Sequence, residues 1–579
     1  DAVIDRANSM FQRDKNHPCI LIWSCGNESS GGQNIFDMSE HFRKHDDTRL
    51  VHYEGIFNER RFNDTSDMES QMYTSADGIE KFLKEHPEKP FICCEYSHAM
   101  GNSCGNLFKY TDLTRTEPRY QGGFIWDYID QAIKARNRYG QEFLAYGGDF
   151  DDRPNDGNFC GNGIVFADRT NSPKIQEVKK LYSDFVIEPT ASSVTVTNES
   201  LFTDAEELLW KVHVDKDGIC IEKAELDIKL APGHRKEFPL PIATQTDFGE
   251  YTVTVSACVK EEKKYSLVGY ELAFGQCVYK VGKAPKTTCP KAKVKAFRIE
   301  DCRYTIGALG EDFHVIFSRE KGLISYLFKN HEFISEPVKP YFWHAPTDNE
   351  RGSRTPFATS QWHSASLYQK IQFMGANKSD TELEVTFRYH LATTPAAFAD
   401  VTYKVTPDGA LKVVLDYKAV EGLPEIPEFG MFIKIPSEYR HISWYGNGPE
   451  ENYSDRKKGA RLGLFFNDVE DNFSAYLKPQ ECGNKTDVRY AEISSDSGIG
   501  IRFEGLPVME FSALPWTPEE METAMHAYEL PPVHHTIVRP ALLRAGVGGD
   551  NSWGAKTHEE FRIPNKDYRF EFCLKGVEN

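Results

Sequence analysis

The chain has 579 residues, of which 40% are hydrophobic, 13% aromatic and 27% charged, so it is long enough for several cores. Lys and Arg total 68 against 87 for Asp and Glu, which gives a formal net charge of -19. A net anion repels nucleic acid and acidic membranes, and no apolar run approaches the roughly 20 residues of a spanning helix. We therefore predict a soluble protein with neither a nucleic-acid nor a membrane partner.

The first part of the chain, residues 1–181, alternates short apolar runs with amphipathic stretches. Such alternation is typical of parallel β/α architecture, and a closed (β/α)8 barrel has eight strands. Only five strand units are visible, and the first element is a helix that follows Asp1. We expect the C-terminal part of a (β/α)8 barrel, with three strands missing. Strands are predicted at 19–24, 50–54, 68–74, 90–95 and 122–128, and helices at 34–45, 77–86 and 106–115.

The pattern changes near residue 182. Residues 182–284 show short alternating segments separated by turn residues, for example Ser193–Thr197, and their length suits an immunoglobulin-like β-sandwich. Residues 281–294 are rich in Lys and Pro and predict a linker. Residues 285–579 again predict strands, including Leu411–Tyr417, in one large β-sandwich domain. The predicted fold class is multidomain α/β plus all-β.

Two glutamates follow strands of the predicted barrel. Glu28 lies in Trp23–Ser29, and Glu95 ends the apolar run that begins at Phe91. If the visible strands are the last five of eight, the strands before Glu28 and Glu95 are the fourth and the seventh. The two carboxylates then face each other across the barrel mouth, where (β/α)8-barrel enzymes place their active sites. One carboxylate can then attack an anomeric carbon while the other protonates the leaving oxygen, and a separation of about 5–5.5 Å makes a glycosidase retaining. The alternative is that each glutamate caps a helix or pairs with an arginine.

The segments around both glutamates resemble glycoside hydrolase family 2, and most closely its large bacterial β-galactosidases. The likeness extends over essentially the whole chain. The segments that carry it are 23–29, 92–103, 122–131, 146–150 and 159–169, and more weakly 345–349, 445–453 and 548–553.

The resemblance implies an enzyme that cleaves terminal β-D-galactosides such as lactose. It implies that Glu28 is the acid/base and Glu95 the nucleophile of a double displacement. It also implies that His98 stabilises the sugar hydroxyls in the transition state, that Tyr73 donates its hydroxyl beside the nucleophile, and that Trp126 is the aromatic floor under the galactose. The alternatives are a core aromatic for Trp126 and a helix cap for His98.

The resemblance further implies Mg²⁺, bound through Glu28, and Na⁺, bound through the backbone carbonyl of Phe159 and the side chain of Asn162. These are the oxygen ligands that hard cations prefer. Asn27, which can donate and accept hydrogen bonds beside Glu28, and Asn162 are the remaining predicted substrate contacts. The resemblance also implies that the barrel is the catalytic domain and that N-terminal domains of the same parent protein are missing here together with the three strands. Further ligands should come from these missing segments. A barrel with unpaired edges is expected to be inactive or feebly active alone.

Members of the family also send a Trp from the last domain into the site, and the segment His534–Arg539, where we expected it, has none. The family is often tetrameric, so a homo-oligomer is an expectation. The 13 cysteines show no disulfide pattern, which favours a reducing compartment and a cytoplasmic location.

Three other functions remain open from the sequence. Gly101-Asn102-Ser103-Cys104-Gly105 fits the G-x-S-x-G elbow of an esterase, although that mechanism needs Ser directly between strand and helix. The chain could instead be a non-catalytic carbohydrate-binding or scaffold fragment. Within the family, a β-glucuronidase is the nearest competitor, but we identify no cationic partner for a uronate.

Overall fold

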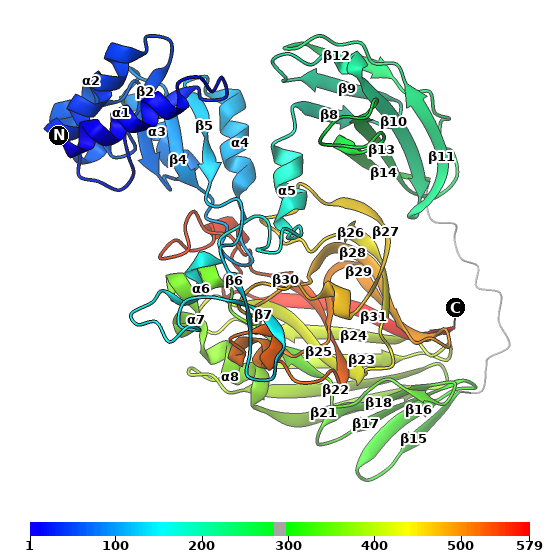
Figure 1. Cartoon of the computed structure of the whole chain (residues 1–579). Coiled ribbons are helices and arrows are strands. Elements are labelled where there is room, and N and C mark those ends of the chain that lie inside the picture. The colour runs from blue at the N-terminus through cyan, green and yellow to red at the C-terminus, as the bar shows by residue number, and fades with distance from the viewer. Residues whose placement is uncertain (283–296, 579) are drawn as a thin grey trace.

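A computed structural model describes residues 1–282 and 297–578, and the predicted linker lies almost wholly outside these ranges. Figure 1 shows an α/β body at the N-terminal end, a small β-sandwich beside it and a large β body below both. Within the described residues, no helix is sufficiently long and apolar to cross a membrane.

The α/β body has five parallel strands in two sheets. The first sheet pairs β1 with β2, and the second has the order β3-β4-β5. The N–H of Asp67 donates to the carbonyl of Val51 at 2.8 Å and links the two sheets. Helices alternate with the strands, as predicted. The bounds are β1 Ile22–Ser24, β2 Leu50–His52, β3 Glu69–Met72, β4 Phe91–Tyr96, β5 Tyr120–Ile125, α1 Ala2–Asp14, α2 Gln33–His45, α3 Ala76–Glu85, α4 Leu107–Thr116 and α5 Lys174–Leu181.

Local sequence explains where these helices begin and which face they bury. The side chain of Ser75 accepts a hydrogen bond from the N–H of Gly78 at 3.2 Å and caps α3. Ile79 and Leu83, four residues apart on α3, are fully buried in the core that also contains Phe91. The helix therefore lies with its apolar stripe against β4, the strand that carries Glu95.

The first strand ends at Ser24, as predicted, although it begins at Ile22 rather than Cys19, and Glu28 lies four residues beyond its end. Pairing of β1 with β2 stops at Ser24, and the N–H of Cys25 then donates to the carbonyl of His52 at 2.8 Å. Gly26 follows with a φ of 146°, a backbone conformation that favours glycine and ends the strand. Glu28 consequently lies in the loop beyond the strand.

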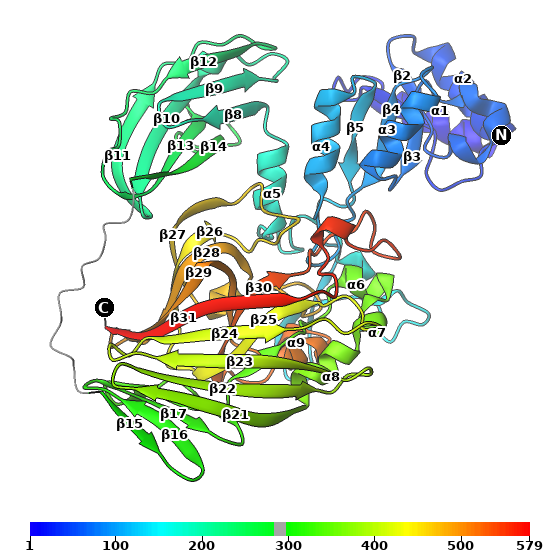
Figure 2. The same cartoon turned by 180° about the vertical axis from the view of Figure 1, so that it is seen from behind.

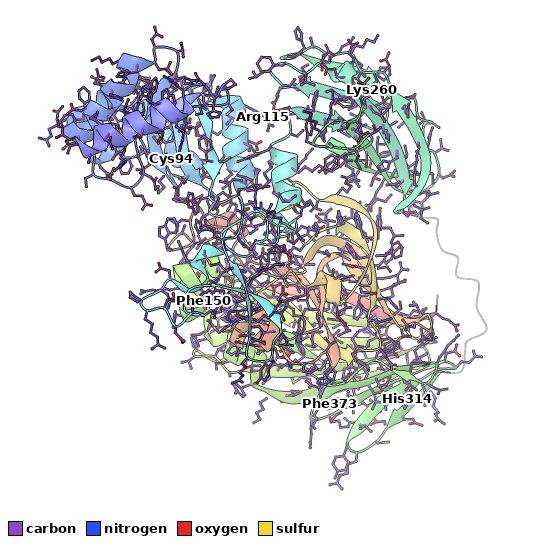
Figure 3. The ribbon with its side chains drawn as sticks, in the orientation of Figure 1. Cys94, Arg115, Phe150, Lys260, His314 and Phe373 are labelled. Carbon is purple, nitrogen blue, oxygen red and sulfur yellow. The ribbon has the colours of Figure 1, made fainter. Side chains whose placement is uncertain are left out.

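The small β-sandwich has seven strands in antiparallel sheets of four and three strands. Burial alternates along β9, where Val194 and Val196 point into a core shared with Trp210. Arg115 of α4 forms an ion pair with Glu199 at 2.9 Å and joins the sandwich to the α/β body (Figure 3). The bounds are β8 Phe185–Pro189, β9 Ser193–Asn198, β10 Leu208–Lys216, β11 Ile219–Leu226, β12 Arg235–Pro239, β13 Gly249–Val259 and β14 Glu271–Val281.

The large β body packs a five-stranded sheet and a twelve-stranded sheet around one hydrophobic core. Phe317 of the smaller sheet lies 6.3 Å, between ring centroids, from Phe387 of the larger one. The bounds are β15 Arg298–Asp301, β16 Thr305–Leu309, β17 Phe313–Ser318, β18 Gly322–Phe328, β19 His331–Glu332, β20 Lys339–Tyr341, β21 Gln369–Ser379, β22 Glu382–Leu391, β23 Ala397–Val405, β24 Leu411–Tyr417, β25 Glu428–Pro436, β26 His441–Gly448, β27 Arg461–Asp468, β28 Lys485–Ser494, β29 Ile499–Leu514, β30 His535–Arg544 and β31 Tyr568–Glu578.

Short helices and one hairpin complete the chain. They lie around the edge of the large β body that faces the α/β body (Figures 1 and 2). They are α6 Asp348–Ser353, α7 Thr355–Thr359, α8 Gln361–Leu367, α9 Pro518–Thr523, β6 Ile133–Arg136 and β7 Glu142–Ala145.

The segment after Glu95 is buried in the large β body. Asn102 donates its side-chain N–H to the carbonyl of Glu481 at 2.7 Å, and Arg456 donates to the carbonyl of Ser103 at 2.6 Å. From the other side, the fully buried ammonium of Lys174 donates to the carbonyls of Ala99 and Gly101 at 2.7 and 2.8 Å. The loop that leaves β4 is thus clamped between two bodies of the protein.

Candidate active site

Glu95 is the next-to-last residue of β4, and its side chain is partly buried. Its Oε2 accepts a hydrogen bond from the hydroxyl of Tyr73 at 2.7 Å, and its carbonyl accepts one from the Tyr73 N–H, also at 2.7 Å. Two bonds therefore fix the relative position of these residues. The predicted pairing of Tyr73 with Glu95 is found in the structure.

Three other carboxylates act on Glu95. Burial raises the pKa of Glu95, the hydrogen bond from Tyr73 lowers it, and the negative charges of Glu28, Glu54 and Asp127 raise it. Across residues 1–282 and 297–578, neither Glu95 nor Glu28 forms an ion pair with Lys or Arg. The alternative of an arginine-paired glutamate is therefore wrong for both.

The loop that holds Glu28 is exposed and has unusual backbone geometry. The N–H of Glu28 donates to Oε2 of Glu54 at 2.9 Å, and burial raises the pKa of Glu54. Glu28, Tyr73 and Ser97 have φ angles of 51°, 53° and 47°, in the left-handed region that non-glycine residues rarely adopt. Strain of this kind gathers at functional sites. Asn27 is exposed in the same loop.

His98 is buried and held by the large β body. Its Nδ1 lies 2.8 Å from the hydroxyl of Ser552, which donates its own proton to Oδ1 of Asn349 at 2.6 Å. Burial lowers the pKa of His98 to about 4, so the ring is neutral at pH 7. Because Nδ1–H must donate to Ser552, Nε2 carries the lone pair and can accept a hydrogen bond.

Aromatic rings surround His98. Trp553 lies edge-on to Tyr73, with 4.7 Å between ring centroids, and 5.2 Å from His98. Phe159 stacks on His98 at 5.3 Å. Trp126 is 38% exposed, and its carbonyl accepts the N–H of Ala99 at 2.7 Å, so it is not a core aromatic. Segments far apart in the sequence thus form one aromatic wall beside Glu95.

Trp553 is the residue that the sequence analysis missed. The family resemblance places the Trp of the last domain in His534–Arg539, but those residues lead into and form the start of β30, and Val538 and Arg539 are buried. The Trp instead comes from the loop after that strand, inside a segment that already carried the family resemblance. Glu54 was missed as well, although it follows a strand just as Glu95 ends one.

Asn162 supplies the observation that bears on a cation. Its Oδ1 is buried and, within the part of the chain that the structure describes, has no hydrogen-bond partner. An unpartnered buried oxygen fits a Na⁺ ligand. For Mg²⁺, no group of three or more His, Cys, Asp and Glu side chains that could hold a metal ion is found in the described ranges, and binding of Mg²⁺ through Glu28 stays a prediction.

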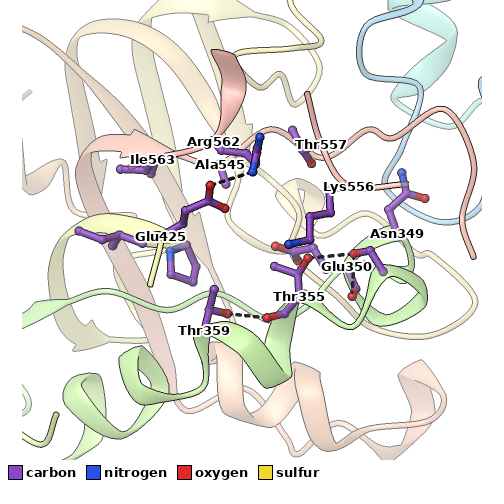
Figure 4. A pocket seen from close by; sticks show the side chains of 13 residues that line it. Asn349, Glu350, Thr355, Thr359, Glu425, Ala545, Lys556, Thr557, Arg562 and Ile563 are labelled. Carbon is purple, nitrogen blue, oxygen red and sulfur yellow. Dashed lines mark hydrogen bonds and ion pairs between the residues drawn. The ribbon is translucent and has the colours of Figure 1, made fainter. Parts of the chain in front are cut away.

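Two other features do not provide a sugar site. A cavity of about 30 Å³ lies beside the base of the Trp553 loop, lined among others by Asn349, Ala545 and Thr557 (Figure 4). That volume holds only about one or two waters. Ser103 of the esterase-like motif is fully buried seven residues after β4, and its hydroxyl donates to the carbonyl of Gly101 at 3.2 Å. It is not on the sharp strand-to-helix turn that an acyl hydrolase requires.

Comparison with known families decides the classification. The sequence profile "Glycosyl hydrolases family 2, TIM barrel domain" matches residues 1–187, "Beta-galactosidase, domain 4" matches 194–280, and "Beta galactosidase small chain" matches 309–574. The chain belongs to glycoside hydrolase family 2.

Relatives within family 2 cover almost all of the chain. A protein named beta-galactosidase from Halalkalibacterium halodurans is 44% identical over 99% of this chain and 57% of its own length. One from Priestia megaterium is 42% identical over 99% of this chain and 56% of its own length. One from Streptococcus thermophilus is 40% identical over 100% of this chain and 58% of its own length. The chain therefore spans little more than half the length of these curated family 2 relatives.

Proposed function

We propose that the protein is a retaining glycoside hydrolase that removes terminal β-D-galactose from lactose-like substrates, with Glu95 as nucleophile and Glu28 as acid/base. The observation that carries the proposal is the setting of Glu95. Its carboxylate is partly buried, receives a hydrogen bond from Tyr73, senses the charge of Glu28 and has no cationic partner among the described residues. The family 2 relatives named beta-galactosidase support the substrate class.

The two displacements assign a task to each carboxylate. Glu95 attacks the anomeric carbon as the bond to the leaving oxygen breaks, and Glu28 gives its proton to that oxygen. Glu28, now a carboxylate, then takes a proton from water, which attacks the anomeric carbon and releases Glu95. The exposed loop of Glu28 lets water and the leaving group reach it.

The surrounding residues bind and orient the sugar. The free Nε2 of His98 accepts a hydrogen bond from a sugar hydroxyl, and Trp126 offers a half-exposed ring to the apolar face of galactose. Asn27 is a hydrogen-bonding partner beside Glu28. Asn162, with the carbonyl of Phe159, would hold Na⁺, which supplies a fixed positive charge for substrate oxygens. Glu28 alone is too little for Mg²⁺, so no step depends on that ion here.

The domain assignment is part of the same proposal. We assign residues 1–181 to the later part of a (β/α)8 barrel, 182–284 to an immunoglobulin-like sandwich and 285–579 to the large sandwich. The described cysteines are free, which fits activity in a reducing compartment such as the cytoplasm. A homo-oligomer would be consistent with the family.

Hydrolysis of nitrophenyl β-galactoside by the full-length protein tests the proposed activity. We expect turnover of the galactoside and little of the matching glucuronide, because no Lys or Arg lies beside Glu95 in the described residues to pair with a uronate. Preference for the glucuronide would contradict the proposal. Binding of galactosides that never leads to turnover and is unchanged by Glu28→Gln would instead support a carbohydrate-binding role.

Removing the Tyr73 hydroxyl should change the pH dependence. Because that hydroxyl lowers the pKa of Glu95, Tyr73→Phe raises it, and the carboxylate needed for attack is lost at a higher pH. We expect the acidic limb of the profile of kcat/KM against pH to move upward. Tyr304→Phe, at a 63% exposed position elsewhere, is the control and should leave the profile unchanged. An acidic limb that stays in place in Tyr73→Phe would contradict the role of this bond.

A further inference from the structure

The loop that carries Trp553 is fixed firmly at its base. Asp455 accepts hydrogen bonds from the N–H groups of Val547 and Gly548 at 3.1 and 2.8 Å. At Gly548 an added Cβ would lie 2.3 Å from the Cα of Gly105, so the two backbones meet where no side chain fits. Trp553, further along, remains 49% exposed, so its position must depend on contacts nearer to it.

Tyr110 of α4 makes such a contact. Its hydroxyl donates to Oδ1 of Asp550 at 2.8 Å. The carbonyl oxygen of Thr74 lies 3.2 Å from the hydroxyl oxygen of Tyr110. Thr74 follows Tyr73 in the chain, and Asp550 precedes Trp553 by three residues. The buried hydroxyl of Tyr110 therefore bonds to the loop of Trp553 and lies against the segment of Tyr73. These two segments carry the rings that lie edge-on to each other.

The charges around Asp550 favour this bond. Lys109 donates to Nδ1 of His558 at 2.8 Å, which leaves the Nε2–H of His558 to donate to Asp550 at 3.2 Å. The carboxylate of Asp550 thus accepts from two donors, and charge-assisted hydrogen bonds are roughly twice as strong as neutral ones. Within the described residues, the hydroxyl of Tyr110 is the contact of Asp550 that comes from the α/β body.

We propose that Tyr110 is a positioning residue, which holds Trp553 against Tyr73 by way of Asp550. It touches neither substrate nor reacting atoms. Its effect on catalysis rests on the proposed function, because the place of Trp553 affects turnover only if Glu95 and Tyr73 form the active site. The effect of Tyr110 on the position of the Trp553 ring does not rest on the proposed function.

The matched variants are Tyr110→Phe and Tyr120→Phe. Both tyrosines are 2% exposed and belong to the same hydrophobic cluster. The hydroxyl of Tyr120, unlike that of Tyr110, has no hydrogen-bond partner in the described part of the chain. Each substitution removes one oxygen from the same core, but only Tyr110→Phe breaks a hydrogen bond, the one to Asp550.

The position of Trp553 can be read directly by fluorine NMR of protein labelled with 5-fluorotryptophan, with the resonance assigned by Trp553→Phe. We expect this resonance to shift or broaden in Tyr110→Phe and to keep its position in Tyr120→Phe. An unchanged resonance in Tyr110→Phe overturns the proposal, whether or not the protein hydrolyses galactosides. Should Tyr110→Phe fail to fold, Asp550→Ala breaks the same bond from the loop side and must shift the resonance.

Kinetics give the second readout on the full-length protein. We expect Tyr110→Phe to lower kcat/KM for nitrophenyl galactoside by about 10-fold, as loss of a hydrogen bond to a charged group commonly does. In a Trp553→Phe background the same substitution should cost nothing further, because its target is already gone. Equal losses in both backgrounds would show a merely structural role. A shifted resonance in a protein without galactosidase activity supports the positioning role and contradicts only the proposed reaction.

Discussion

Replacing Glu95 by Gln is expected to lower kcat for nitrophenyl β-galactoside by at least about 10⁴-fold, because an amide cannot form the glycosyl intermediate. The change keeps the size of the side chain and an acceptor for the Tyr73 hydroxyl, so the fold should survive. Hydrolysis rates over a range of enzyme concentrations measure the residual activity.

Glu28→Gln is the companion variant, and it should behave differently. Loss of the acid costs about 10²- to 10⁴-fold where the leaving group needs a proton, as lactose does. A dinitrophenyl leaving group needs none, so its first step should be nearly unaffected. Ser103→Ala, the esterase control, should keep sugar cleavage. Because Glu28 also serves the second step, which both substrates share, the comparison is made on kcat/KM, which reports the first step. Equal losses of kcat/KM for lactose and the dinitrophenyl galactoside in Glu28→Gln, or wild-type rates in Glu95→Gln, would contradict the assignment of roles.

The largest expected effect on stability lies in the core of the large β body. Arg539 donates to Glu428 and to Glu481, both at 2.7 Å, and all three side chains are at most 1% exposed. Arg544 stays beside both carboxylates, 2.8 Å from Glu428 and 4.0 Å from Glu481, but Arg539→Met leaves this buried cluster with two carboxylates and one of its two cations. Breaking a buried pair in this way typically costs about 3–5 kcal/mol. We expect a clear fall in the midpoint of urea unfolding followed by circular dichroism.

Arg569→Met is the matched control for Arg539→Met. Arg569 pairs with Asp416 at 2.7 Å, but its side chain is 56% exposed. Water and salt screen such a pair, so its loss should cost less than about 1 kcal/mol. If the two variants unfold at the same urea concentration, the buried cluster does not stabilise the protein as its burial implies.

Elements set by local patterns could be predicted closely. The strand Leu411–Tyr417 has the predicted bounds, because alternate residues such as Val413 and Leu415 face the core. The helix predicted at 34–45 is observed at Gln33–His45. The pairing of the Tyr73 hydroxyl with the Glu95 carboxylate is implied by the family resemblance alone, and the structure brings the two side chains together.

The rest of the site depends on tertiary contacts that no local pattern encodes. Ser552 meets His98 across 454 positions of sequence, and Trp553 reaches Tyr73 from the same loop. The first strand begins at Ile22 rather than at Cys19, because its pairing with β2 begins at Leu50. Glu54 follows β2 as directly as Glu95 ends β4, so its place after a strand is the signal that points to it, and its carboxylate accepts the N–H of Glu28.

The clamped segment that leaves β4 has a consequence for engineering. Carbonyls at Ala99, Gly101 and Ser103 take their donors from Lys174 and Arg456, so the catalytic loop has no complete set of partners within its own body. Lys174 belongs to the α/β body and Arg456 to the large β body, so grafting the large β body of another enzyme onto this α/β body would leave the carbonyl of Ser103 without its donor. The graft would have to bring a guanidinium equivalent to that of Arg456. A chimaera of this protein should therefore keep the α/β body and the large β body from the same parent.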